Sequence, residues 1–560
     1  MRHVVIVGAG MAGHRVAAEI RARQPDWPVT LIGAEPHQPY NRVLLTNLLA
    51  GSATERSIEL PRHQEGTTVA TGVRVTAIDR AARTVTAHDG SVTGYDSLVL
   101  ATGGLAWLPP VKGLVGDNGR PHDGTAAFRT LADCRRILDL AGTVVATAPA
   151  GRSPRGLVLG GGLLGIEAAR GLAQRGLEVR VLHAADRLME RQLDAAAGRV
   201  LGQALERLGI TVELGAAVTE VTAEDGRLTG VKCADGRRIA GDLLVVSCGA
   251  QPDTRLAESA GLPVGRGVLV DDWMRTADPR VYAIGDCAEH RGTVHGLVAP
   301  AWEQARVAAQ AITQDVEGAP YRGSRIVTRL KAAGIDLTTM GESGLTEDDA
   351  YAEGEGEGGA EAERGAQAGS GAHLGSGAHL GSGAHDGSGA QAGSGAQAGS
   401  GDGGAPEVVR FLDTRRGTYQ KLILRQNRVT GAILLGDSTG ATAGGGTVSR
   451  LFDRQAEAPL DRRLLLFPEF PEPGAAAANA PGAGGLPGDA VVCQCNAVTK
   501  DAIVRCRQAG AADVTAVAAR TRATTGCGSC RPLVEELLAR PADPSGPPGT
   551  GHGHTHRKEH

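Results

Sequence analysis

The sequence predicts an α/β protein in which two doubly wound units of the same design are combined with two smaller domains. Outside three low-complexity segments, strand and helix patterns alternate along the chain, as in a parallel sheet covered by helices. A short apolar strand that ends in a glycine-rich turn and continues into a helix occurs twice, at Gly8 and at Gly160. Four of the nine cysteines form two close pairs in the last 70 residues, which indicates a separate small domain.

Length, charge and cysteine content exclude several classes of protein. The chain has 560 residues, long enough for about two to four domains, but its 82 glycines and 27 prolines are too many for one continuous core. A net charge of −4 excludes a globally basic nucleic-acid binder. No run of about 18 apolar residues occurs, so we expect no membrane-spanning helix. Nine cysteines do not make a disulfide scaffold, and we expect a cytoplasmic protein.

The first glycine-rich turn predicts a dinucleotide site. It lies between a short apolar run at 3–7 and a helical pattern at 11–23. The first glycine permits a tight turn, the second lets a pyrophosphate approach the backbone, and the third lets the helix pack on the strand. A second strand, 29–32, ends just before an acid 22 residues after the last glycine, where a ribose-binding carboxylate is expected. The predicted contacts are Gly8, Ala9, Gly10, Met11, Ala12, Gly13 and Glu35.

The second turn repeats this pattern with one change. A strand at 156–159, three spaced glycines, a helix to about residue 175 and a strand at 178–182 follow in order. The next residue is His183, not an acid, and Arg180 and Arg187 are near, so NADH and NADPH both stay open. Glu167, on the first turn of the helix, either suits the helix dipole or lies near a nicotinamide. The predicted contacts are Gly160, Gly162, Leu163, Gly165 and His183, with Glu167 as the candidate catalytic residue.

Two dinucleotide sites in one chain have a use when a nicotinamide reduces a flavin, because the two cofactors must meet in one pocket. Residues 281–286 form a strand ending in Gly-Asp, which resembles the motif that holds the FAD ribityl chain through Asp286. Thr102 and Gly103 resemble the crossover motif that accompanies this Gly-Asp motif in such flavoproteins. Gly249 resembles the counterpart of that crossover motif after the second unit. The whole arrangement resembles glutathione-reductase-like flavoproteins. No Cys-x4-Cys pair follows the first turn, so we expect no thiol–disulfide reductase.

The paired cysteines predict a metal centre. Cys493 and Cys495 are separated by 31 residues from the second pair, Cys527 and Cys530. Thiolates at this spacing favour zinc or an iron–sulfur cluster. The second pair leads into a helix predicted over 532–538, whose N–H groups and neighbouring glycines suit an anionic cluster. A one-electron carrier has a use beside a flavin that structural zinc lacks, so we predict a [2Fe–2S] cluster.

The remaining segments define the domain organisation. Strands predicted at 408–412, 418–425 and 428–435 indicate a small domain that begins before an acidic insertion with a His/Gln-containing hexapeptide repeat. The predicted parts are an FAD-binding domain (1–115 and 250–320), an NAD(P)H-binding domain (116–249), a small α+β domain (321–345 and 406–465), a disordered insertion (346–405), a linker (466–489), a small helical cluster domain (490–540) and a His-rich disordered tail (541–560).

These motifs together resemble one family. Residues 1–345 resemble the FAD- and NAD-binding half of the assimilatory nitrite reductase large subunit, and 490–540 resembles bacterioferritin-associated-ferredoxin-like [2Fe–2S] modules. The stretches that carry the resemblance include Gly8-Ala9-Gly10-Met11-Ala12-Gly13-His14, Glu35-Pro36-x-x-Pro39-Tyr40-Asn41-Arg42, Tyr282-Ala283-Ile284-Gly285-Asp286-Cys287-Ala288, Gly296-Leu297-Val298-Ala299-Pro300 and Lys331-x-x-Gly334-Ile335-Asp336. The resemblance implies that Arg42 contacts the FAD pyrophosphate and that Arg129 lies near the flavin.

The chain also departs from that family, because the further cysteine pairs of a sirohaem and [4Fe–4S] module do not occur. The resemblance therefore implies an electron-transfer subunit of assimilatory nitrate or nitrite reduction. We predict that electrons pass from NAD(P)H through FAD and the cluster to a catalytic nitrate or nitrite reductase subunit, with a homodimer as one open assembly. The alternatives are a subunit of an amino-acid or amine dehydrogenase, a rubredoxin or ferredoxin reductase, and a redox-responsive binding protein.

Overall fold

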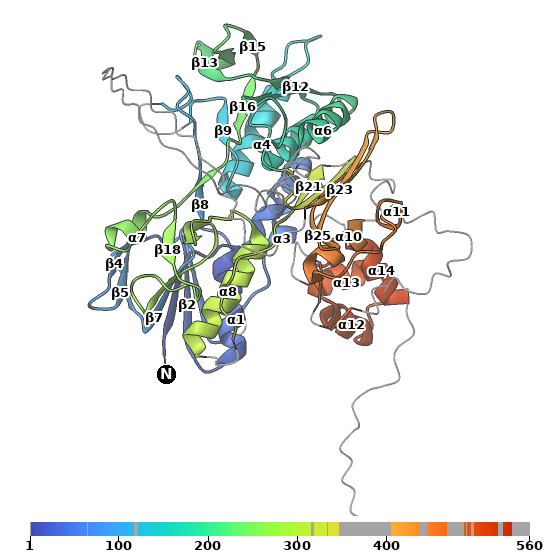
Figure 1. The fold of residues 1–560 in the computed structure, drawn as a ribbon. Coiled ribbons are helices and arrows are strands. Elements are labelled where there is room, and N and C mark those ends of the chain that lie inside the picture. The colour runs from blue at the N-terminus through green and yellow to red at the C-terminus, as the bar shows by residue number, and fades with distance from the viewer. Residues whose placement is uncertain are drawn as a thin grey trace, which may run out of the picture. The chain divides into compact units, whose positions relative to one another are not determined.

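The computed structural model describes residues 2–63, 65–116, 121–314, 318–332, 334–345, 405–436, 445–467, 486–488, 490–493, 498–524 and 530–539. The chain forms two compact units, Met1–Pro471 and Glu472–His560. Nearly all of the predicted insertion and linker, and the whole of the predicted tail, lie outside the described residues. The described part of the first unit contains three five-stranded sheets, and Figure 1 shows helices packed against them.

The first sheet has the strand order β19-β7-β1-β2-β3, and all of its pairings are parallel. Its strands are β1 (Val4–Val7), β2 (Val29–Gly33), β3 (Thr67–Thr71), β7 (Ser97–Leu100) and β19 (Val281–Ala283). Every residue of β1 is buried, because a central parallel strand is covered on both faces. Helices α1 (Met11–Arg23) and α8 (Val298–Thr313) lie side by side and share one apolar cluster with this sheet (Figure 1).

The second sheet copies the first in order and direction. It runs β12-β11-β10-β16-β9 with parallel pairings, so that β10 takes the central place that β1 takes in the first sheet. Its strands are β9 (Thr125–Ala127), β10 (Arg155–Leu159), β11 (Glu178–His183), β12 (Ile210–Leu214) and β16 (Leu243–Val246). Its helices are α4 (Leu131–Ala146), α5 (Leu163–Gln174) and α6 (Ala195–Arg207). The predicted duplication of a doubly wound unit is therefore confirmed.

Short strands, of which one pair is parallel and the others antiparallel, and short helices complete the two copies. Each copy carries a three-stranded sheet: β4 (Val75–Asp79), β5 (Thr84–Ala87) and β6 (Val92–Gly94) in the first, and β13 (Val218–Glu224), β14 (Arg227–Cys233) and β15 (Arg238–Ala240) in the second. Strand β8 (Gly104–Ala106) pairs with β17 (Ala250–Pro252), and β18 (Val268–Val270) pairs with β20 (Ala288–His290). The short helices are η1 (Arg42–Leu44), α2 (Leu45–Ala50), α3 (Glu55–Ile58), α7 (Arg255–Ser259) and η2 (Gly285–Cys287).

The third sheet is antiparallel and has the order β21-β22-β25-β24-β23. Its strands are β21 (Val327–Ala332), β22 (Ile335–Gly341), β23 (Glu407–Asp413), β24 (Thr418–Arg425) and β25 (Arg428–Gly436). Side chains of this sheet share one apolar cluster with α5 and α6, and others share a second cluster with α10 (Gly445–Arg454) and α11 (Arg463–Leu466). Because β22 pairs with β25, the segment predicted as an insertion connects strands of a single sheet.

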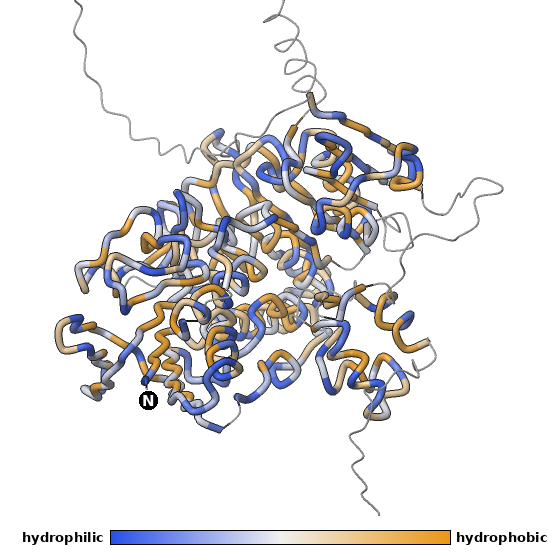
Figure 2. Tube along the Cα trace, turned by 60° about the horizontal axis from the view of Figure 1, so that its bottom comes forward, coloured by the Kyte–Doolittle hydropathy of each residue, from blue (hydrophilic) through white to orange (hydrophobic). Residues whose placement is uncertain are grey.

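The second unit holds a small helical core. It contains β26 (Val491–Cys493), β27 (Val498–Thr499), α12 (Lys500–Gln508), α13 (Val514–Thr521) and α14 (Arg531–Ala539). The side chains of Thr499 and Asp513 cap α12 and α13 by accepting backbone N–H bonds. The helix predicted over 532–538 is confirmed by α14. In Figure 2 apolar stretches follow the strands and one face of the helices, whereas the connecting turns are hydrophilic.

Candidate functional site

The glycine turn after β1 leaves room for a ligand beside the start of α1. Gly8 has a φ of +115°, and a Cβ there would overlap the carbonyl oxygen of Ala101. A Cβ on Gly13 would overlap the carbonyl oxygen of Gly8, which explains the close packing of helix and turn. Gly10 caps α1 without any side-chain hydrogen bond, and a Cβ on it would meet nothing within 4 Å. Open space beside uncapped helix N–H groups fits a dinucleotide pyrophosphate.

The turn after β10 has the same construction. Gly160 has a φ of +117°, and a Cβ there would overlap the carbonyl oxygen of Ser247, which follows β16 as Ala101 follows β7. Gly165 packs on Gly160 as Gly13 packs on Gly8. Gly162 caps α5, again with no side-chain cap and no atom within 4 Å of a Cβ, and Leu163 begins the helix. The second turn therefore fits a second dinucleotide by the same physical criteria.

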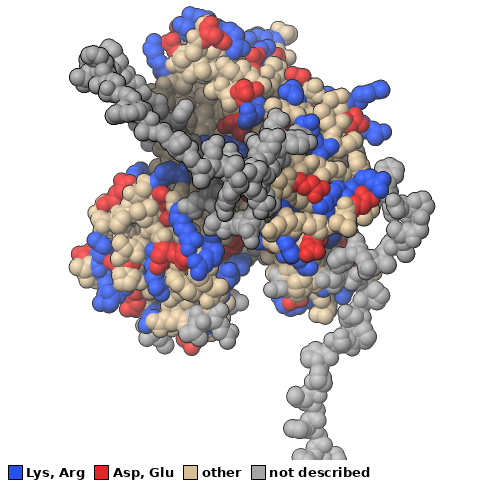
Figure 3. Space-filling view, in the orientation of Figure 1, with Lys and Arg blue, Asp and Glu red and all other residues tan. Residues whose placement is uncertain are grey.

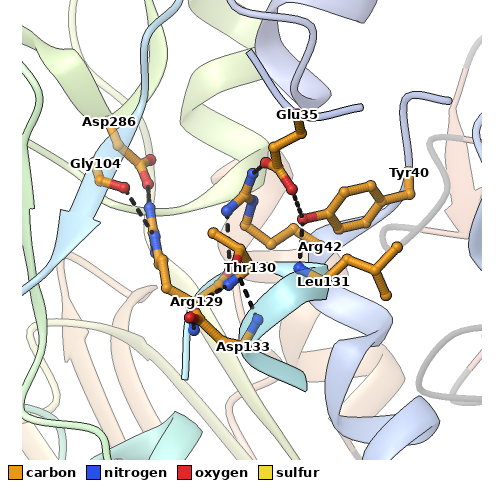
Figure 4. A network of polar contacts seen from close by, with 9 residues as sticks. All are labelled: Glu35, Tyr40, Arg42, Gly104, Arg129, Thr130, Leu131, Asp133 and Asp286. Atoms are coloured by element: carbon orange, nitrogen blue, oxygen red, sulfur yellow. Dashed lines mark hydrogen bonds and ion pairs between the residues drawn. The ribbon is translucent and has the colours of Figure 1, made fainter. Parts of the chain in front are cut away.

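A network of polar contacts surrounds the residues predicted at the FAD site (Figure 4). The carboxylate of Glu35, two residues after β2, accepts a bond of 2.6 Å from the Arg42 guanidinium and one of 2.8 Å from the Tyr40 hydroxyl. The Tyr40 hydroxyl also accepts from the backbone N–H of Leu131, at 2.9 Å. Arg42 donates to the backbone oxygen of Arg129 at 2.9 Å. The chain thus brings Glu35 and Arg42, predicted as separate contacts, into one ion pair.

The same network reaches Asp286 through Arg129. The Arg129 guanidinium forms an ion pair with the Asp286 carboxylate and donates to the carbonyl oxygen of Gly104. Asp133 and Thr130 form a capping box at the start of α4, and Asp133 also accepts from the backbone N–H of Arg129. Neither Tyr40 nor Asp133 was among the residues predicted from the sequence to form the site. The Thr-x-x-Asp spacing before an apolar helix could have indicated the capping box.

The two predicted crossover segments are hydrogen-bonded to each other. Thr102 donates its hydroxyl to the backbone oxygen of Asp253 at 2.7 Å, and the N–H of Asp253 donates to Gly103 at 2.9 Å. The N–H of Trp107 donates to the backbone oxygen of Gly249 at 3.0 Å. Together with the β8–β17 pair, these bonds fix the ends of the first and second copies against each other. The cofactor sites of the two copies are therefore parts of one compact unit.

Two predicted residues of the second copy differ from expectation. Glu167 is the fifth residue of α5, one turn beyond the first turn where it was predicted, because the helix already begins after Gly162. It is also buried, with 4% of its surface exposed. His183 is the last residue of β11 rather than the residue after it, and its ring nitrogens are both in contact range of other groups. Nδ1 is 3.1 Å from the N–H of Gly161, and Nε2 is 3.0 Å from the Glu190 carboxylate.

The cysteines fall into two chemically different groups. Cys493 ends β26 and Cys530 directly precedes α14, and both belong to the apolar core of the second unit. Their predicted partners Cys495 and Cys527 lie outside the described residues. In the first unit, burial raises the pKa of Cys134 to about 12 and that of Cys248 to about 11. These two thiols stay protonated at neutral pH and do not act as thiolate nucleophiles.

Charged side chains of both signs lie on the described surface. On the face seen in Figure 3, basic and acidic side chains are interspersed on the described parts of the chain. Among those same residues, no helix is both long and apolar enough to cross a membrane.

Comparison with known proteins identifies the family of the chain. Residues 2–311 match the family described as "Pyridine nucleotide-disulphide oxidoreductase". The chain belongs to this family. Residues 491–540 match the "BFD-like [2Fe-2S] binding domain", and 398–443 match the "Rubredoxin NAD+ reductase C-terminal domain". This pyridine nucleotide-disulphide oxidoreductase is therefore an NAD(P)H-dependent FAD enzyme with a [2Fe–2S] domain, and the predicted cofactors are confirmed.

Two curated relatives of this oxidoreductase are named for the reduction of nitrite or nitrate. The chain is 32% identical to "Nitrite reductase [NAD(P)H]" of Bacillus subtilis (strain 168), over 96% of the chain and 57% of the relative. It is 30% identical to "Assimilatory nitrate reductase electron transfer subunit" of the same organism, over 96% of the chain and 59% of the relative. The chain thus spans a little under three fifths of the length of these two relatives.

Solved structures share the fold. The covalent putidaredoxin reductase–putidaredoxin complex has a TM-score of 0.63 and 24% identity, and the match covers 84% of this chain and 97% of that one. The similarity confirms the predicted fold class of a flavoprotein with two dinucleotide-binding units, and the two related sheets described above are its structural basis.

Proposed function

We propose that this chain takes electrons from NAD(P)H and delivers them, through FAD and the [2Fe–2S] cluster, to the catalytic subunit of an assimilatory nitrate or nitrite reductase. The observation that carries the proposal is the fixed joining of two dinucleotide sites within one unit, in a chain that also bears a cluster domain. The names of the two Bacillus relatives support the nitrogen-oxyanion acceptor. The low cysteine content supports a reducing, cytoplasmic location.

The proposal gives each of these residues a role. The first turns of α1 and α5 offer uncapped N–H groups to the two pyrophosphates. Glu35 accepts from ribose hydroxyls of FAD, and Arg42 beside it offsets pyrophosphate charge. Asp286 would accept from the ribityl hydroxyls, and the ion pair with Arg129 supports this role by holding the carboxylate in position. When bound, FAD supplies the change from two-electron hydride chemistry to the one-electron chemistry of the cluster.

Three further assignments concern the nicotinamide and the cluster. Glu167 is buried in α5, and we assign it to orienting the nicotinamide ring rather than to stabilising the helix end. Cys493, Cys495, Cys527 and Cys530 would hold the cluster, and Cys493 and Cys530 already share one apolar core. The core keeps water away from these two thiolates, which helps to set the reduction potential of a cluster.

A second candidate function is a reductase for rubredoxin or a ferredoxin. It is favoured by the match of 398–443 to the rubredoxin reductase C-terminal domain. Steady-state oxidation of NADH and NADPH by the full chain, with a nitrate reductase catalytic subunit, a nitrite reductase, rubredoxin or a ferredoxin as acceptor, separates the two. Fast turnover with rubredoxin or ferredoxin and none with the nitrogen-oxyanion reductases would refute the proposed acceptor.

A variant pair tests the proposed route. Cys530→Ser should abolish transfer to the physiological acceptor, while NAD(P)H-dependent reduction of ferricyanide continues because that small oxidant accepts directly from flavin. Cys134→Ser is the matched control, because it removes a buried cysteine of the first unit that has no assigned role. Equal transfer to the acceptor by wild type and Cys530→Ser would contradict the route through the cluster.

A further inference from the structure

The segment after β11 folds back onto the glycine turn of the second copy. The backbone N–H of Gly161 donates to Nδ1 of His183 at 3.1 Å, and the N–H of Met189 donates to the carbonyl oxygen of Gly161 at 3.0 Å. A Cβ on Gly161 would lie only 2.7 Å from both the His183 ring and the Leu188 side chain. The turn and the segment from His183 to Met189 are therefore held in one arrangement, which also fixes the next residue, Glu190.

The hydrogen-bond pattern sets the state of His183. A backbone N–H can only donate, so Nδ1 of His183 carries no hydrogen. The ring hydrogen is then on Nε2, which donates to Oε2 of Glu190 at 3.0 Å. Both ring nitrogens are occupied, and the His183 side chain is 12% exposed. Glu190 is 38% exposed, and its second oxygen, Oε1, makes no hydrogen bond within the described part of the chain.

Two of the three arginines near His183 and Glu190, Arg180 and Arg187, are engaged by other groups. The Arg187 guanidinium donates to the backbone oxygens of Leu193 and Glu190 and forms an ion pair with Asp186. Arg180 pairs with Glu178 and Glu213 and lies three residues before His183, roughly 10 Å along the strand. Arg191 is exposed to solvent beside Glu190 and has no partner among the described residues.

We infer that Glu190, positioned by His183, is the residue that selects the nucleotide, and that the chain uses NADH in preference to NADPH. In a dinucleotide-binding unit, the residue at the end of the second strand meets the adenosine ribose. Here His183 is the residue at the end of the second strand, and it holds the carboxylate of Glu190, seven positions later, at this place. That carboxylate accepts from the 2′-hydroxyl of NADH and repels the 2′-phosphate of NADPH. The inference rests on the proposed function, because it requires a pyridine nucleotide in the second copy.

Binding of redox-inactive analogues to the full, FAD-loaded chain tests the inference without turnover. Calorimetry should give ADP-ribose an affinity at least about tenfold above that of 2′-phospho-ADP-ribose, the ratio that one hydrogen bond to a charged group supplies. Steady-state kcat/KM values should favour NADH over NADPH by a similar factor. Glu190→Gln should lower both ratios about tenfold, because it removes the charge and keeps the size of the side chain.

Two further variants separate positioning from general damage. His183→Ala should shift the ratio in the same direction by a smaller factor, and combining it with Glu190→Gln should add little, since both act through one carboxylate. Glu178→Gln is the matched control, because it neutralises an exposed glutamate at the opposite end of β11 and should leave both affinities unchanged.

The results distinguish this inference from the proposed function. A preference of wild type for 2′-phospho-ADP-ribose, or a ratio unchanged in Glu190→Gln, would overturn the inference while the chain remained an NAD(P)H oxidoreductase. Failure of wild type to bind either analogue or to oxidise either nucleotide would overturn the proposed function together with the inference.

Discussion

Replacing Tyr40 with phenylalanine removes a single oxygen atom from the centre of the FAD-site network. Tyr40 is 6% exposed, and its hydroxyl both donates to Glu35 at 2.8 Å and accepts from the N–H of Leu131 at 2.9 Å (Figure 4). Burial raises the pKa of Tyr40, so the hydroxyl remains a donor at all working pH values. It is the group through which the carboxylate of Glu35 is linked to the first turn of α4.

The size of the expected loss of stability follows from the hydrogen-bonding groups that lose a partner in Tyr40→Phe. Glu35 keeps its 2.6 Å contact with Arg42, so the carboxylate is not left alone. The N–H of Leu131 is buried and loses its acceptor, which costs about 1–3 kcal/mol. Together with the lost bond to Glu35, the unfolding free energy should fall by about 2–3 kcal/mol. FAD affinity should fall about tenfold, because the carboxylate proposed to bind the ribose is held by one partner instead of two.

Chemical denaturation of the FAD-free chain and fluorescence of FAD released on dilution measure the two effects separately. Tyr95→Phe is the matched control, since Tyr95 is 5% exposed and its buried hydroxyl has no hydrogen-bond partner within the described structure. Tyr95→Phe also removes one hydroxyl oxygen, and it should lower the unfolding free energy by less than about 0.5 kcal/mol. If Tyr40→Phe and Tyr95→Phe release FAD equally slowly, the network does not contribute to cofactor binding and the reasoning is refuted.

Three other predictions concern stability and the second site. Lys421 is 1% exposed, and its ammonium lies 2.7 Å from the carboxylate of Asp194. Lys421→Met should therefore lower the unfolding free energy, measured by urea denaturation, by about 2–4 kcal/mol. A smaller effect than that of the same substitution at an exposed lysine would contradict this prediction. Burial lowers the pKa of His63 to about 4, and the pKa of His14, whose ring centroid lies 4.1 Å from that of His63, also falls. The unfolded chain therefore takes up protons before the folded chain as pH drops below 6.5. Unfolding free energy should therefore decline between pH 6.5 and 4, by about 1–2 kcal/mol after solvent screening, and His63→Gln should flatten this decline relative to wild type. Gly162→Ala, where a Cβ meets no protein atom, should leave the melting temperature within about 2 °C and weaken ADP-ribose binding about tenfold, and unchanged binding would show that no ligand lies there.

The sequence by itself determined the elements whose signals are local. The buried runs of β1 and β10, the glycines at fixed spacing and the helices that follow them are set by steric limits within a few residues. Three strands of the third sheet, β23, β24 and β25, were predicted to within one residue at each end, because alternating apolar residues and turns mark them. The two cysteine pairs, and the cluster that they indicate, were also recognised from the sequence alone, because the short spacing of metal ligands is visible in the sequence.

Only the tertiary structure decided which distant side chains meet. Glu35, Arg42, Arg129 and Asp286 come from segments up to about 250 residues apart, and nothing in their local sequence shows that they form one network. The start of α5 placed Glu167 one turn deeper than expected, because a glycine can cap a helix without leaving any side-chain signature. The carboxylate missing from the end of β11 is supplied by Glu190 from a segment that returns to the glycine turn. Such returns depend on packing across the whole unit, and packing is not encoded in any short window of sequence.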